Sequence, residues 1–169
     1  STIAGLEDNA VLAEMSNKFG GNHLNEESLI ARARAQGFST AVIGKLGPTR
    51  IQDLTAAADG SQTLILDDDT GHEGGLGLPG WFSDRMKSAF LPAAVPARQV
   101  PNIAQEVWLM KATTRIVLPH FAAAGKPFAL LFWSRDPDMS QHQTLDSVGE
   151  PVPGRHEEDQ AFAQEWSVD

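Results

Sequence analysis

Short apolar runs along the chain predict three strands. The runs at 40–43 and 63–66 are short and partly β-branched, as is typical of buried strands. The run at 128–133 is continuously apolar, which is typical of a strand buried on both faces of a parallel sheet. We therefore expect these three segments to form one sheet.

Between the runs, apolar residues spaced three and four positions apart predict helices. A short amphipathic helix is expected at 6–15. A second helix is expected at 26–36, with Asn25 as its N-cap and Gly37 as its C-cap. A further helix is predicted at 81–90.

The longest predicted helix follows Asn102, which we expect to act as its N-cap, and closes at Gly125. Pro119 is expected to kink this helix or to end it early, because proline lacks the N–H that a helix interior requires. Apolar residues at helical spacing predict the stripe that faces the core. The stripe comprises Ile103, Val107, Met110, Thr114, Val117, Leu118 and Phe121.

The order helix, strand, loop, strand, helix, strand predicts an α/β fold, with a mostly parallel sheet flanked by helices. Ligands of such sheets bind beyond the carboxyl ends of the strands. Three segments here follow a strand directly, at 44–45, 67–69 and 134–138. We divide the chain into one α/β domain at 1–154 and an acidic tail or short amphipathic helix at 155–169.

Composition narrows the kinds of partner that we expect. The chain has 169 residues and a formal net charge of −9, without a cluster of Lys and Arg, so no nucleic-acid polymer is expected as a partner. No apolar run reaches about 18 residues, so no membrane span is expected. Cysteine is absent, so Asp, Glu and His must hold any metal ion.

Asp138 and His142 are the strongest candidates for metal ligands. They are four residues apart, so a helix beginning at Asp138 would bring both side chains to one face. Asp136 is a candidate third carboxylate. The alternative is that Asp138 is only the N-cap of a helix. Arg135 either clamps a substrate phosphate or forms a local salt bridge to Asp136 or Asp138, and both interpretations stay open.

Two stretches of the chain resemble the alkaline phosphatase superfamily, in its branch of type I phosphodiesterases and nucleotide pyrophosphatases. Residues 126–142 resemble the strand and Pro-Asp-x-x-x-His of that branch, and residues 31–45 resemble the helix and strand that precede its metal segment. The resemblance implies that Asp138 and His142 are metal ligands within an incomplete alkaline-phosphatase-like core. It also implies two divalent ions, usually zinc, a phosphate-ester substrate, and a bacterial periplasmic or secreted location.

The chain departs from the pattern of that family at both ends. No motif marks the Thr or Ser nucleophile, and no Asp is followed directly by His. We therefore assign no catalytic residue and expect the chain to be part of a divalent-metal-dependent phosphohydrolase. The alternative is a catalytically silent α/β remnant or binding module. An incomplete sheet would leave an edge or an apolar face exposed, so self-association is also expected.

Other charged residues are expected to be structural or solvated. The acidic triplet at 67–69 predicts a solvated loop rather than a cation site. Lys45 and Arg50 are expected to be ordinary surface charges rather than phosphate contacts. His23 lies in a turn rich in Gly and Asn, so we expect it to meet solvent.

Overall fold

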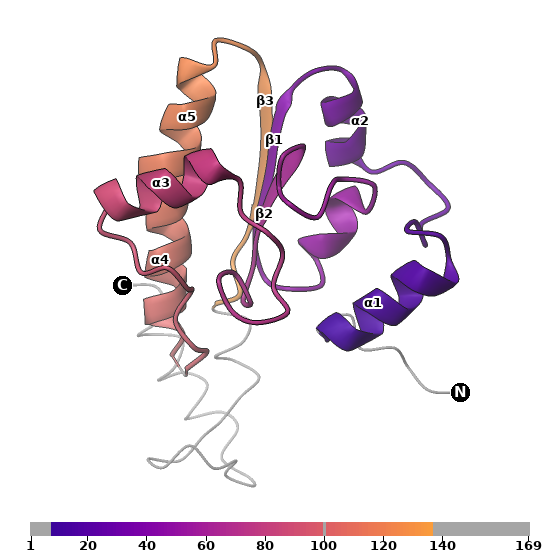
Figure 1. The fold of residues 1–169 in the computed structure, drawn as a ribbon, viewed down its shortest axis with the longest axis horizontal. Helices are drawn as coiled ribbons and strands as arrows, with labels where there is room; N and C mark the ends of the chain where they lie inside the picture. Colours follow the sequence, from indigo (N-terminus) through magenta and orange to yellow (C-terminus); the bar gives the residue numbers. More distant parts are fainter. Residues whose placement is uncertain (1–7, 100, 137–169) are drawn as a thin grey trace, which may run out of the picture.

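The computed structural model describes residues 8–99 and 101–136, in which helices enclose a three-stranded sheet (Figure 1). The strands are β1 (Ser39–Gly44), β2 (Thr63–Leu66) and β3 (Phe128–Trp133). Their order is β2-β1-β3, and both pairings are parallel. The predicted α/β fold is confirmed, and all three predicted strands are present.

Helices cover both faces of the sheet (Figure 1). One face carries α3 (Gly80–Ser88), α4 (Ile103–Ala112) and α5 (Leu118–Ala123). The other carries α1 (Asn9–Lys18), α2 (Leu29–Ala35) and the short 3₁₀ helix η1 (Arg50–Asp53). Within the described residues, no helix is both long enough and apolar enough to cross a membrane. The predicted tail at 155–169 lies outside these residues.

The main core fills the space between the sheet and the helices α3, α4 and α5. Phe82 from α3 and Leu109 from α4 are fully buried there, against Leu66 of β2 and Ile43 of β1. Burial of each such side chain stabilises the fold by about 1.5–3 kcal/mol. This layer therefore holds β1 and β2 against the helices α3 and α4.

Helix α2 begins later than its sequence predicts, at Leu29 rather than at 26. Ser28 is the N-cap in place of Asn25, because its Oγ accepts a hydrogen bond from a backbone N–H of the first turn at 3.1 Å. The same hydroxyl donates to the carbonyl of Gln52 in η1. Gly37 ends the helix as predicted, with a φ of 85° that favours glycine.

The long helix does not end at Pro119, because α5 continues beyond it to Ala123. Helices α4 and α5 are joined by a π-helical segment, η2 (Thr113–Val117), in which the N–H of Leu118 donates to the carbonyl of Thr113. Proline lacks an N–H, and its ring would clash with the carbonyl four residues earlier in a regular α-helix. The wider turn before Pro119 accommodates both effects.

The buried face of α4 differs from the predicted stripe. Ile103, Val107 and Met110 are 38%, 42% and 49% exposed, and Thr114 is also exposed. The buried residues of the long helix are Gln105, Trp108, Leu109, Ala112, Thr113, Ile116, Val117 and Phe121. Both sides of α4 carry apolar residues at helical spacing, so the spacing alone does not identify the side that packs on the sheet.

Strand β3 lies at an edge of the described sheet, and the prediction that it is buried on both faces is wrong, because none of its side chains is fully buried. Phe128 and Trp133 at its two ends are 45% and 47% exposed, and the residues between them are half-buried. The central strand is β1, in which Ala41 and Val42 are fully buried. An apolar run therefore predicts a strand, but it gives neither the position of that strand in the sheet nor the degree of its burial.

Candidate functional site

The carboxyl ends of the three strands meet at one edge of the sheet, as the parallel topology predicts. Gly44 at the end of β1 pairs with Trp133 at the end of β3, and the N–H of Lys45 donates to the Trp133 carbonyl at 3.0 Å. A Cβ at Gly44 would lie 1.8 Å from that carbonyl oxygen, and the φ of Gly44 is 131°. Glycine is therefore required where the two strands end side by side.

Arg135 forms a buried ion pair with Asp68 across this edge. Nη2 of Arg135 donates to Oδ2 of Asp68, and the two side chains are only 3% and 4% exposed. The same carboxylate oxygen accepts a hydrogen bond from the N–H of Leu46 at 3.3 Å. To the two predicted roles of Arg135 the geometry adds a third, an ion pair with a residue far away in sequence. A substrate phosphate would have to compete with Asp68 for this guanidinium.

Asp67 forms a second buried ion pair, with Nε of Arg50. Oδ1 of Asp67 also accepts a hydrogen bond from the N–H of Asp69 at 3.0 Å. Burial raises the pKa of Asp67, although the charge and hydrogen bond of Arg50 act in the opposite direction. The predictions of a solvated loop at Asp67 and Asp68, and of a surface charge at Arg50, are wrong, because Asp67 pairs with Arg50 and Asp68 pairs with Arg135.

The segment that leads to the predicted metal ligands is held by the first turn of α4. Oε1 of Glu106 accepts hydrogen bonds from the N–H of Arg135 at 2.8 Å and from the N–H of Asp136 at 3.3 Å. Oδ2 of Asp136 accepts a hydrogen bond from the N–H of Asn102 at 2.6 Å. Burial raises the pKa of Glu106 despite these donors. The chain after β3 is thus fixed in position as far as Asp136.

Asn102 precedes α4, but its side chain does not cap the helix as predicted. Its Nδ2 donates to Oε1 of Gln105 at 2.7 Å, and its Oδ1 accepts a hydrogen bond from the N–H of Gln99 at 3.2 Å. The side chain therefore joins the loop before α4 to the helix. This arrangement presents the N–H of Asn102 to Asp136, which links the helix start to the end of β3.

Asp138 and His142, the predicted metal ligands, lie outside the described residues. Within 8–99 and 101–136, no three or more Asp, Glu or His side chains are grouped so as to hold a metal ion. Asp68 nevertheless has a buried carboxylate oxygen, Oδ1, without a hydrogen-bond partner in this part of the chain. An unmet carboxylate oxygen fits a cation, so Asp68 suits a metal better than Asp136, whose carboxylate is bonded to Asn102.

Comparison with known proteins adds no family to this picture. No protein-family model matches the chain. Likewise, no curated protein and no solved structure matches it. The resemblance to the alkaline phosphatase superfamily therefore rests on the motif residues alone, and the function that it implies is a hypothesis.

Proposed function

We propose that this chain carries one metal-binding corner of a divalent-metal-dependent phosphohydrolase, of the phosphodiesterase, nucleotide pyrophosphatase or phosphatase type. Asp138 and His142 hold the ion in this proposal, and zinc is the ion proposed. The observation that supports this best is the anchoring of Arg135 and Asp136 at the carboxyl edge of a parallel sheet. Open α/β sheets bind their ligands at this edge.

Anchoring matters because a metal ligand needs supporting contacts that hold it in one position. Glu106 fixes the backbone of Arg135 and Asp136, and Asn102 fixes the carboxylate of Asp136. Only Pro137 separates this fixed carboxylate from Asp138 in the sequence. The proposed ligands therefore follow a segment that has little freedom to move.

Asp68 is the third protein ligand in this proposal. Catalytic zinc usually takes three protein ligands, and the sequence motif provides two. Arg135 binds Oδ2 of Asp68 and so orients the carboxylate, whereas Oδ1 has no partner among the described residues. When bound, a divalent ion supplies Lewis-acid stabilisation of phosphoryl oxygens. Asp68, Asp138 and His142 hold the ion, and Arg135 orients Asp68.

The test is the metal content of the whole chain. Protein is loaded with zinc or manganese, dialysed, and measured by atomic spectroscopy. We expect about one ion per wild-type chain and strong loss in Asp138→Ala and His142→Ala. His156→Ala is the matched control, because it removes a histidine that the proposal does not use. Equal metal content in wild type and His142→Ala would contradict the proposal.

Asp68→Asn tests the third ligand separately, because it keeps the shape of the side chain and removes its charge. We expect zinc affinity to fall by about tenfold or more. Circular dichroism on the same sample reports whether the fold survives the loss of the pair with Arg135. Unchanged zinc affinity in a folded Asp68→Asn variant would leave Asp68 as a purely structural partner of Arg135.

The alternative is a catalytically silent α/β remnant or binding module. The observation that favours it is that Arg135 and Asp68 are buried and paired with each other, which gives both a structural role. Zinc content separates the two functions. Bound zinc that His142→Ala removes supports the metal corner, whereas a folded wild-type chain without bound zinc supports the remnant or binding module. Hydrolysis of bis(4-nitrophenyl) phosphate by this chain is expected to be slow or undetectable, because no nucleophile is assigned.

We propose that the chain self-associates through β3 at the open edge of the sheet. Among the described strands, β3 lies at an edge, and its terminal residues Phe128 and Trp133 are 45% and 47% exposed. Light scattering after size-exclusion chromatography is expected to show a mass that rises with concentration. Phe128→Lys is expected to suppress the rise, and Phe90→Lys is the control, because Phe90 is 94% exposed elsewhere.

A further inference from the structure

A cavity of about 320 Å³ lies beside α1, on the sheet face opposite the main core. Its walls come from α1, from η1 and the residues after it, from β2, and from the loop at 74–76. The walls are mostly apolar and include Leu12, Ala13, Leu54, Ala57, Ile65 and Leu76. Sites for small molecules have volumes of about 300–1,000 Å³ and mostly apolar walls, so this cavity suits a short ligand.

Two side chains that line this cavity carry buried nitrogens without partners. Within the described residues, neither ring nitrogen of His23 forms a hydrogen bond, although both are buried. Nη2 of Arg50 is likewise buried without a partner. Buried polar atoms in proteins are nearly always hydrogen-bonded. These nitrogens therefore indicate a group that the protein itself does not provide. The expectation that His23 meets solvent is wrong for its ring nitrogens.

The polar atoms of the cavity favour an acceptor over a donor. Arg50 uses Nε to bind Asp67, which leaves Nη2 as an unused N–H donor. Asp53 also lines the cavity, but its carboxylate is already bound by Nε of Arg34 at 2.8 Å and by the hydroxyl of Thr63. A ligand that accepts hydrogen bonds therefore matches the groups that remain.

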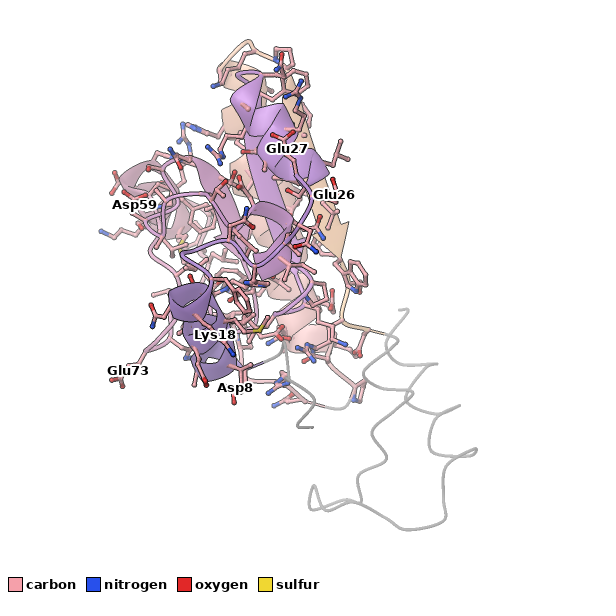
Figure 2. All side chains as sticks on the ribbon, turned by 90° about the vertical axis from the view of Figure 1, so that its right-hand side faces the viewer. Asp8, Lys18, Glu26, Glu27, Asp59 and Glu73 are labelled. Carbon is pink, nitrogen blue, oxygen red and sulfur yellow. The ribbon has the colours of Figure 1, made fainter. Side chains whose placement is uncertain are left out.

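Surface carboxylates do not supply that acceptor. Figure 2 looks onto the side of the molecule that carries α1, and the labelled side chains of Asp59 and Glu73 point outward into solvent. Both residues are exposed, and neither lines the cavity.

We propose that this cavity binds a small organic carboxylate with a short apolar tail. The carboxylate accepts hydrogen bonds from Nη2 of Arg50 and from a ring nitrogen of His23, and the tail packs against Leu12, Ile65 and Leu76. A phosphate dianion fits less well, because the carboxylates of Asp53 and Asp67 are close to Arg50. The site shares no residue with the proposed metal ligands, so the two proposals can be tested independently.

Calorimetric titration of the whole chain with sodium hexanoate tests the ligand class. Hexan-1-ol keeps the tail and removes the charge, and hexylamine reverses the charge. We expect saturable binding of hexanoate, binding of hexanol that is at least about tenfold weaker, and no binding of hexylamine, because hydrogen bonds to charged groups are the stronger ones. Equal binding of hexanoate and hexanol would overturn the proposed head-group contacts.

Two variants test the location. His23→Phe keeps a ring but removes both nitrogens, so hexanoate should bind at least about tenfold more weakly, while the melting temperature of the ligand-free protein rises. Ala57→Phe fills the cavity and should abolish binding. Ala104→Phe is its control, because Ala104 is exposed on α4 away from the cavity. Unchanged hexanoate affinity in both His23→Phe and Ala57→Phe would overturn the site.

Arg50 is left intact in these tests, because its loss would also strand the buried Asp67 and could prevent folding. The zinc content of His23→Phe is expected to equal that of wild type. Failure of the carboxylate site is therefore distinguishable from failure of the metal site.

Discussion

The carboxyl edge of the sheet and the cavity beside α1 treat buried polar groups in opposite ways. At the edge, ion pairs join distant parts of the chain, Arg135 to Asp68 and Arg50 to Asp67, and Oδ1 of Asp68 is an acceptor without a hydrogen-bond partner among the described residues. Among the residues that line the cavity, Arg50 carries a buried donor, Nη2, without a hydrogen-bond partner in the described part of the chain. An unmet acceptor fits a cation and an unmet donor fits an anion.

Arg50 belongs to both regions. Its Nε donates to Asp67 at the edge, and its side chain also lines the cavity. One guanidinium can do this because its five N–H donors point in fixed, different directions. The charge of the ligand that each site would accept, a cation at the edge and an anion in the cavity, distinguishes the two candidate sites more than the number of charged groups nearby.

The largest expected effect comes from the backbone of the two regions. Gly44→Ala at the edge would place a Cβ 1.8 Å from the Trp133 carbonyl oxygen, so we expect loss of folding or of more than about 4 kcal/mol. Gly74→Ala at the cavity meets no atom within 4 Å, and only its φ of 82° opposes the change, at about 1–2 kcal/mol. Urea unfolding followed by tryptophan fluorescence measures both. Similar losses for both variants would show that β1 and β3 do not approach as closely as described.

Local pattern predicts the strands well and their surroundings poorly. The runs at 40–43 and 63–66 are strands because each is short, apolar and bounded by turn residues, all of which is information held within a few positions. The start of α2 depends instead on Ser28, whose hydroxyl also meets Gln52 in a different element. The edge position of β3 depends on strand order, which no single run of residues contains.

The candidate site divides in the same way. Convergence of the three strand ends follows from parallel topology, so it was predictable from the order of elements. The partners of Asp67 and Asp68 were not, because Arg135 is 67 residues from Asp68 and the pairing needs the strand register. The role of Glu106 in binding the segment after β3 was not predictable either, because a carboxylate in the first turn of a helix usually reflects the helix dipole.

The next largest effect tests whether the ion pair at the edge supports the fold. Arg135→Ala leaves the carboxylate of Asp68 buried without its charge partner, so we expect a loss of about 3–5 kcal/mol in the free energy of unfolding. Arg32→Ala is the matched control. Its pair with Glu27 is 3.7 Å long, the side chains are 64% and 51% exposed, and its removal should change stability by less than about 1 kcal/mol. Equal losses would mean that burial of the edge pair has been overstated.

The smallest expected effect is a difference in pH dependence between one carboxylate of each region. For Asp53 at the cavity, burial alone would raise the pKa, but the hydrogen bonds from Arg34 and Thr63 and the charge of Arg34 outweigh burial and lower it. For Asp67 at the edge, burial prevails and raises the pKa. The two groups should therefore respond to acid in opposite directions.

The direction in which stability changes with pH depends on whether the folded or the unfolded protein takes up the proton at the higher pH. Asp53 stabilises the fold above the unfolded pKa of about 3.9, and this contribution is lost as the pH falls through its lower folded pKa. The pKa of Asp67 is higher in the folded than in the unfolded protein, so as the pH falls the folded protein takes up this proton first. Wild type therefore gains stability relative to Asp67→Asn as the pH falls from 7 towards about 4. Over that range the gap between wild type and Asp53→Asn should stay constant, and it should shrink only below about pH 4. Urea unfolding of the three proteins at several pH values measures both gaps. A parallel response of the two variants would show that burial does not prevail at Asp67, and the contrast between edge and cavity would then rest on geometry alone.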